Sequence, residues 1–267
     1  MFKESDIVNE IVVSMHKYFE KNNLPNKVVI GISGGKDSAV VAALAVKAFG
    51  KDNVIGIMMP NGIQKDISDS KKVIDFLELT HYATVNIEKA YSDLTEEIKN
   101  ANFDAGKSTY TTNTPARLRM TTLYGIAACY GAVVLNTCNL SEDVLGYSTF
   151  YGDSAGDFAP INKLTVAEVL DIGDYLGLPK DIVHKAPGDG MCGSTDEENL
   201  SKQLGFKFSY EKLDALIRGD VTVFTSDERE KLMERYLKMK YKVDIINIPH
   251  YEPHLYNWFI STTSTES

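Results

Sequence analysis

The chain of 267 residues contains no apolar run that approaches the ~18–20 residues needed for a membrane-spanning helix. It also has few basic side chains. There are 28 Lys and Arg residues against 37 Asp and Glu residues, which gives a net charge of −9. An acidic surface disfavours broad binding to nucleic-acid phosphates. We therefore expect neither a membrane nor a nucleic acid among the partners of this protein.

Cysteine is scarce, and its spacing is not that of a redox motif. Cys129, Cys138 and Cys192 are odd in number and show no C-x-x-C spacing. Residues 1–20 carry acidic side chains on a helical pattern, unlike a secretory signal peptide. We expect reduced thiols and a cytoplasmic location.

Two widespread phosphate-binding loops are missing. A Walker loop requires G-x-x-x-x-G-K-[ST], but here Asp37 follows Lys36. The dinucleotide fingerprint G-x-G-x-x-G fails because Ser33 occupies its second glycine position. A later Gly-Lys-Ser at 106–108 has Ala101 where a Walker loop has its first glycine. A phosphate site must therefore come from another kind of turn.

Such a turn occupies residues 27–38, which read KVVIGISGGKDS. The β-branched run is typical of a buried parallel strand, and a helical run follows the glycines directly. Strand, turn and helix together present backbone N–H groups and the positive end of a helix dipole to an anion. Asp37 would repel a phosphate unless a hard cation such as Mg²⁺ lay between them. We predict a phosphate site formed by Gly31, Ile32, Ser33, Gly34, Gly35, Lys36, Asp37 and Ser38.

Strands and helices alternate through the first half of the chain. The pattern predicts strands at 28–32, 54–59, 82–87 and 132–136, and helices at 5–21, 39–49, 67–79, 91–99 and from 114 to about 130. This alternation indicates an α/β fold: a doubly wound parallel sheet flanked by helices, Rossmann-like, as a single domain over 1–267. Ligands bind at the carboxyl ends of the strands in such sheets, where residues 33–38 and 137–142 fall.

The connections and the second half give further expectations. Thr114 and Pro115 are suited to begin a helix, which leaves 100–113 as a polar loop. Helices are predicted at 165–176, 209–218 and 226–239, and a disordered tail at 261–267. The segments 100–113 and 186–197 are polar or Gly-rich, so we expect them to act as lids.

Several strings, in order along the chain, resemble those of one enzyme family. They are SGGKDS at 33–38, ARLRM at 116–120, TCNLSE at 137–142, GYSTFYGD at 146–153 and TDE at 195–197. Over roughly residues 10 to 245 the chain resembles the ammonia-dependent NAD synthetases of the ATP pyrophosphatase superfamily. The resemblance implies that ATP adenylates the nicotinate carboxylate of deamido-NAD and releases pyrophosphate. Ammonia would then displace AMP and form NAD.

The resemblance also implies roles for particular residues. Asp37 and Glu142 would be catalytic and would bind Mg²⁺. Thr137 and Lys185 would contact ATP, with either Lys163 or Lys185 replacing a family lysine that this chain lacks. The acceptor, deamido-NAD, would be bound by Arg117, Tyr147, Phe150, Asp157 and Lys242. Two arginines separated by one residue do not share a helix face, and the resemblance selects Arg117 over Arg119. A homodimer with deamido-NAD near the subunit boundary is also implied.

Some positions depart from the family pattern and keep other interpretations open. Phe150 and Val166 stand where the family has lysines, Gly188 stands where it has Thr or Ser, and Tyr241 replaces a histidine. A second hypothesis is therefore another adenylating enzyme of the superfamily, acting on a different carboxylate or a nucleobase. A third is a non-catalytic nucleotide-binding domain, against which the retention of Asp37, Glu142 and Arg117 counts. The phosphate loop lies close to the N-terminus with no glutaminase module before it, so we expect free ammonia to be used.

Overall fold

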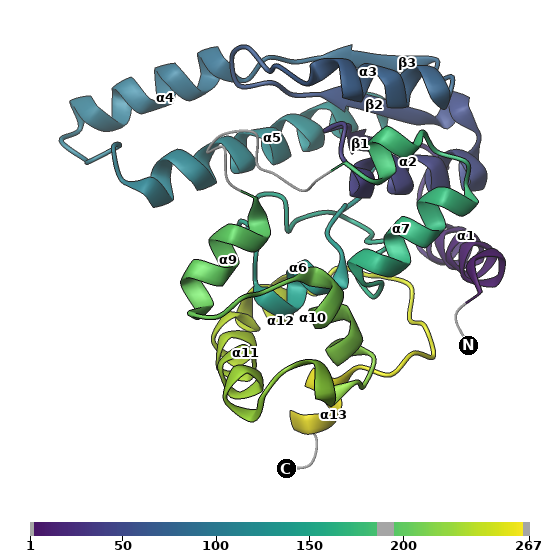
Figure 1. Ribbon diagram of the computed structural model, residues 1–267. Coiled ribbons are helices and arrows are strands. Elements are labelled where there is room, and N and C mark those ends of the chain that lie inside the picture. Colours follow the sequence, from purple (N-terminus) through teal and green to yellow (C-terminus); the bar gives the residue numbers. More distant parts are fainter. Residues whose placement is uncertain (1–2, 186–194, 264–267) are drawn as a thin grey trace.

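A computed structural model describes residues 3–185 and 195–263 of the chain (Figure 1). Its four-stranded sheet is parallel, with the strand order β3-β2-β1-β4. The strands are β1 (Val28–Gly31), β2 (Val54–Met58), β3 (His81–Thr84) and β4 (Val133–Val134). Val28 of β1 pairs with Val54 on one side and with Val133 on the other. The predicted parallel sheet is confirmed, although β3, an edge strand with all four residues exposed, is shorter than expected.

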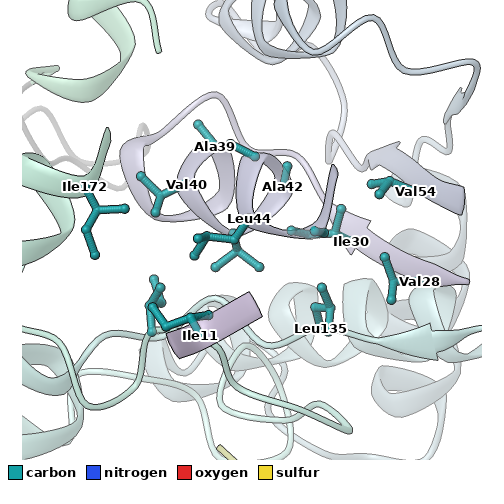
Figure 2. Close-up of a cluster of buried hydrophobic side chains, with 14 of the residues drawn as sticks. Ile11, Val28, Ile30, Ala39, Val40, Ala42, Leu44, Val54, Leu135 and Ile172 are labelled. Atoms are coloured by element: carbon teal, nitrogen blue, oxygen red, sulfur yellow. The ribbon is translucent and has the colours of Figure 1, made fainter. Parts of the chain in front are cut away.

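Successive residues of the central strands point to opposite faces, and both faces are covered by helices. Val28 and Ile30 belong to a core shared with α1 (Glu4–Lys21), α2 (Lys36–Phe49) and α7 (Val166–Tyr175). Figure 2 shows these two side chains near Leu44 of α2. Val29, Ile55, Ile57 and Val134 pack instead against α5 (Ser108–Tyr130). The sheet is therefore doubly wound, as the sequence predicts.

A second cluster of apolar side chains, separate from the sheet, lies among the C-terminal helices (Figure 1). The predicted helices at 165–176, 209–218 and 226–239 are confirmed to within two residues at each end. Among the described residues, no helix has the length and apolar character required to cross a membrane. The remaining helices are α3 (Ile67–Phe76), α4 (Glu88–Asn100), α6 (Leu140–Leu145), α8 (Lys180–Val183), α9 (Asp196–Leu204), α10 (Tyr210–Ile217), α11 (Ser226–Met239), α12 (Tyr241–Ile246) and α13 (Trp258–Thr263).

The predicted start of α5 is wrong. The helix begins at Ser108 and contains Pro115 in its interior, so residues 108–113 of the expected polar loop at 100–113 are helical. Contacts with α4 account for the extension: the rings of Tyr91 and Tyr110 stack at 6.0 Å, and the Thr95 Oγ1 and Tyr110 hydroxyls lie 2.8 Å apart. Packing of this kind overrides local propensity.

Two further expectations concern the loops and the C-terminus. Residues 261–263 belong to α13, so the predicted disordered tail is wrong for this part. The second predicted lid, at 186–197, is described only from Thr195 onward, where α9 begins with a capping box. Gly188 lies outside the described residues.

Candidate active site

The site lies where the order of the strands reverses. From β1 the sheet grows through β2 to β3 on one side, and β4 is added on the other. The residues after β1 and those after β4 consequently meet at the carboxyl edge of the sheet, the position at which doubly wound folds bind ligands. A hydrogen bond from Asn139 Nδ2 to Asp37 Oδ1, at 3.0 Å, joins the two segments.

The turn after β1 has the conformation of an anion-binding site in the absence of an anion. Gly34 has φ +82°, and a Cβ there would lie 2.7 Å from the backbone N of Ser70 in α3. The Ser33 and Ser38 hydroxyls lie 3.0 Å apart, and Gly35 N donates to Ser33 Oγ. Gly35, as the N-cap residue of α2, has no side chain with which to accept a capping bond. The first N–H groups of α2 therefore remain available to a ligand.

Two carboxylates, of Asp37 and Glu142, lie close enough at this turn for their charges to interact. Burial raises the pKa of Glu142 well above its usual value, and the charge of Asp37 adds to the shift. Lys36 Nζ lies 2.8 Å from Asp37 Oδ2 and serves as the counter-ion. Burial alone would lower the pKa of Lys36, but the charges of Asp37 and Glu142 raise it. The pair is thus a partly buried concentration of negative charge with one lysine to balance it.

This donor set fits a magnesium ion that is completed by a substrate. Among residues 3–185 and 195–263, no group of three or more His, Cys, Asp or Glu side chains gathers as a metal cluster. Mg²⁺ commonly takes one or two protein carboxylates together with water and phosphate oxygens. Asp37 and Glu142 beside a phosphate-binding turn match that pattern, and a cation would also relieve their mutual repulsion.

A cavity of about 620 Å³ lies on the other side of the sheet edge, against α5. Arg117 lines it together with Tyr124 and Tyr151, and Arg117 Nε donates to the carbonyl oxygen of Phe150 at 3.1 Å. Arg119 points elsewhere and donates to the carbonyl oxygen of Met59 at 3.0 Å. The prediction that the two arginines occupy different faces is confirmed. The remaining lining residues are Met120, Thr121, Ala155, Gly156 and Ile246.

Several predicted ligand-binding side chains are engaged within the protein. Asp157 accepts hydrogen bonds from the Tyr124 hydroxyl at 3.1 Å and from Val134 N at 2.9 Å. Lys242 Nζ donates to two carbonyl oxygens, of Gly146 and Ser148, both at 2.7 Å. These side chains fix the loop after β4, so any contact with an acceptor would add to a structural role.

The other predicted residues lie around the same edge of the sheet. Lys185 pairs with Asp66 at 2.6 Å and with Asp69 at 2.8 Å, and Asp69 borders Gly34. Tyr147 donates to Asp196 Oδ1 at 3.3 Å. The Phe150 ring packs on Tyr151 and Tyr241, with centroids 3.9 Å and 5.7 Å away. Thr137 lies two residues after Leu135, which forms a bridge just beyond the end of β4.

Three residues to which the sequence interpretation gave no role belong to this site. Asn139 Nδ2 donates to Asp37 Oδ1 at 3.0 Å and the Asn139 backbone N donates to Glu142 Oε2 at 3.4 Å, so one residue orients both carboxylates. The N-x-x-E spacing of a capping box was the available signal. Asp196 contributes to the raised pKa of Lys36, and Tyr210 is buried near Glu142.

Comparison with known proteins gives a consistent result. The family model for NAD synthase matches residues 7–248. The NH(3)-dependent NAD(+) synthetase of Pyrococcus furiosus is 41% identical over 209 residues, which cover 78% of this chain and 77% of the relative. The enzyme of the same name from Methanocaldococcus jannaschii is 39% identical over 224 residues, 80% of each chain.

Solved structures agree with the sequence comparison. NMN synthetase from Francisella tularensis superposes with a TM-score of 0.78 at 30% identity, covering 91% of this chain and 96% of that one. NH3-dependent NAD synthetase from Campylobacter jejuni gives a TM-score of 0.73 at 27% identity, covering 90% and 96%.

Proposed function

The chain belongs to the NAD synthase family, and on this basis we propose that it converts deamido-NAD to NAD with ammonia at the expense of ATP. The nicotinate carboxylate attacks the α-phosphorus of ATP, which forms an acyl-adenylate and releases pyrophosphate. Ammonia then attacks the acyl carbon, and AMP leaves. The observation that carries this proposal is the convergence of Asp37, Asn139 and Glu142 beside the phosphate-binding turn.

In the first step negative charge develops on the departing pyrophosphate. The N–H groups at the start of α2 donate hydrogen bonds to it, and Lys36 adds positive charge. The hydroxyls of Ser33 and Ser38 hold the turn in place through their contact with each other and the bond from Ser38 to the Gly35 carbonyl oxygen. Fixed donors that are oriented before the reaction stabilise such charge most effectively. Mg²⁺, when held by Asp37 and Glu142, would supply further positive charge at the same oxygens.

The second step requires no nucleophilic side chain. The acyl-adenylate is already activated because AMP is a far better leaving group than an oxide. What the protein contributes is the orientation of the acceptor toward ATP and the exclusion of competing water. Arg117, at the wall of the 620 Å³ cavity, would hold the acceptor by its negatively charged groups.

A smaller acceptor is the second candidate. The similar fold of the Francisella tularensis NMN synthetase favours it, as does Phe150, which stands where the ammonia-dependent NAD synthetases have a lysine. The alternative acceptor is nicotinate mononucleotide, which carries the same carboxylate without the adenosine half.

One assay separates these possibilities. Pyrophosphate release from ATP and Mg²⁺ is measured with deamido-NAD, nicotinate mononucleotide and ammonium each added or omitted. We expect pyrophosphate and NAD to form together only when deamido-NAD is present. Release with the mononucleotide alone would move the assignment to the second candidate. A folded, ATP-binding protein that shows no acceptor-dependent release would contradict both.

Substitution of Arg117 tests the acceptor side of the site. Arg117→Ala should raise the KM for deamido-NAD about tenfold to a hundredfold, because a charged hydrogen bond contributes about 1.5–3 kcal/mol. The KM for ATP should change little. Arg119→Ala is the matched control, since its side chain bonds to Met59 outside the cavity. Equal effects of the two substitutions on the acceptor KM would contradict the assignment of Arg117.

We further propose that the protein is a homodimer that associates through α4 and α5. None of the residues of α4 is buried, and Leu94, Phe103, Tyr124 and Tyr130 are exposed along this pair of helices. Figure 1 shows α4 and the first half of α5 extending together away from the sheet. The acceptor cavity opens beside α5, so a partner chain on this surface would lie close to deamido-NAD.

A further inference from the structure

Asp214 is a buried carboxylate that connects three helices near the active site. It lies on α10 and is 5% exposed. Its Oδ1 accepts from the Ser141 hydroxyl of α6 at 2.5 Å, and its Oδ2 accepts from Ala167 N of α7 at 2.8 Å. Both carboxylate oxygens therefore have partners, and each partner comes from a different helix.

The Ser141 hydroxyl has a fixed orientation because of this contact. It donates its proton to Asp214 and accepts from Val166 N at 3.1 Å. Ser141 directly precedes Glu142, and α6 has only six residues. So short a helix is not held by its own hydrogen bonds, and its direction depends on tertiary contacts.

A second side chain on the same face of α10, that of Tyr210, also lies near Glu142. Tyr210 is four residues before Asp214, one helical turn away, so the two side chains share a face. Tyr210 is buried among residues of α6 and α10. Burial and the charge of Glu142 raise the pKa of the Tyr210 hydroxyl. This face of α10 therefore supports α6 directly beneath the candidate metal site.

We propose that Asp214 is a positioning residue for Glu142, acting through Ser141 to fix the direction in which α6 presents that carboxylate to Asp37. The role rests on the proposed function, in which Glu142 and Asp37 hold Mg²⁺. Asp214 itself touches neither the metal nor a substrate. Without it, Ser141 loses the acceptor for its proton, and α6 is free to turn its first residues away from the phosphate-binding turn.

A nearby ion pair provides a control that separates an effect on helix packing from an effect on the position of Glu142. Arg218, the residue that follows α10, donates to both oxygens of Glu168 of α7, at 2.7 Å and 2.6 Å. This pair joins α7 to α10, as Asp214 does, but makes no bond to α6. Glu168→Gln should therefore weaken the packing of the two helices without moving Glu142.

The test compares Asp214→Asn, Ser141→Ala and Glu168→Gln with the unchanged protein. Melting temperature is recorded as Mg²⁺ is titrated in the presence of α,β-methylene-ATP, a nucleotide that cannot be split at the reacting bond. The Mg²⁺ concentration for half of the maximal rise reports binding without turnover. The Mg²⁺ dependence of kcat is measured alongside.

We expect Ser141→Ala to raise the half-saturating Mg²⁺ concentration about tenfold or more, as loss of outer-shell support does at metal sites. Asp214→Asn keeps one amide oxygen for its two donors and should raise that concentration by less. Glu168→Gln should lower the melting temperature and leave that concentration unchanged. If Asp214→Asn does not fold, the Mg²⁺ dependence of Ser141→Ala tests the proposal by itself. Lower melting temperatures with unchanged Mg²⁺ dependence in both site variants would overturn the proposal. Absence of any Mg²⁺ effect in the unchanged protein would overturn the metal site and, with it, the role of Asp214.

Discussion

At the scale of single residues, Glu142 serves two purposes whose contributions to stability have opposite signs. Its Oε2 accepts from Asn139 N at 3.4 Å and so completes the capping box of α6. The same carboxylate is buried beside Asp37, which raises its pKa. A buried charge near a like charge costs free energy until a cation arrives. The site is thus less stable than its packing alone would make it.

Glu142→Gln should separate the two purposes. The amide oxygen can still accept from Asn139 N, whereas the buried charge is removed. In the absence of divalent cations we expect a melting temperature equal to or above that of the unchanged protein. We expect kcat/KM to fall by about 10²–10³, the usual loss when one group that stabilises transition-state charge is removed. A destabilised variant with normal turnover would show that Glu142 acts only as a capping residue.

The Asp214 carboxyl gives a prediction for pH. Burial raises its pKa from 3.8 to about 6, although bonds from Ser141 and Ala167 oppose the shift. The folded protein therefore keeps the proton to higher pH than the unfolded chain, and the free energy of unfolding falls as pH rises from about 4 to about 6. Over this whole pH interval, ionisation of Asp214 lowers the free energy of unfolding by at most about 3 kcal/mol.

Urea denaturation of the unchanged protein and of Asp214→Asn between about pH 4.5 and 7.5 tests this sign. The stability of the unchanged protein relative to the variant should decrease as pH rises, because only the unchanged protein must ionise a buried carboxyl. A difference that stays constant or grows with pH would contradict the raised pKa.

At the scale of elements, the phosphate-binding turn is defined by its contact with α3. Gly34 has a positive φ, and the backbone of Ser70 and the side chain of Asp69 leave no room for a Cβ. Gly35 has φ −96°, and a Cβ there would meet only Ser33 Oγ, at 3.4 Å. The two adjacent glycines therefore differ sharply in what they tolerate.

Gly34→Ala should destabilise the fold by about 1–3 kcal/mol through backbone strain and should abolish detectable ATP binding, since the turn must move away from α3. Gly35→Ala is the matched control, and it should lower the free energy of unfolding by well under half as much. Urea denaturation and calorimetric titration with ATP measure the two effects. Equal losses for both variants would show that the turn is not held against α3 in solution.

At the scale of the whole molecule, the sheet and the C-terminal helices form separate apolar clusters that α6 and α7 bring together. Leu140 and Val144 of α6 belong to the C-terminal cluster, while Val169 and Ile172 of α7 belong to the sheet cluster. The bonds that Val166 N donates to Ser141 and that Ala167 N donates to Asp214 join α7 to these helices. The active site is consequently built at the junction of both halves of the chain, and its geometry depends on their relative position.

The proposed dimer is tested by sedimentation equilibrium. The unchanged protein should sediment at twice the 29.6 kDa of one chain. Leu94→Lys, on the exposed face of α4, should shift it toward the monomer. Val13→Lys on α1 is the control, because Val13 is also exposed but lies away from α4 and α5. A monomeric unchanged protein, or equal effects of the two lysines, would contradict the proposed interface.

The sequence alone determined the features that depend on neighbouring residues. The apolar runs at 28–32 and 54–59 indicated buried parallel strands because both faces of such strands are covered. Thr165 with Glu168 marked the start of α7 because a capping box lies within one helical turn. The glycine-rich turn after β1 and its serines were likewise visible as a local string, which is why an anion site is predicted there.

Only the tertiary structure decided which side chains meet. Asn139 contacts Asp37 across 102 residues of chain, and Ser141 contacts Asp214 across 73. The local sequence pattern holds no information about contacts between residues so far apart in the chain. The same reason accounts for the corrections: α5 extends past Pro115 because α4 packs against it. Packing between distant segments, rather than local propensity, placed the two carboxylates together.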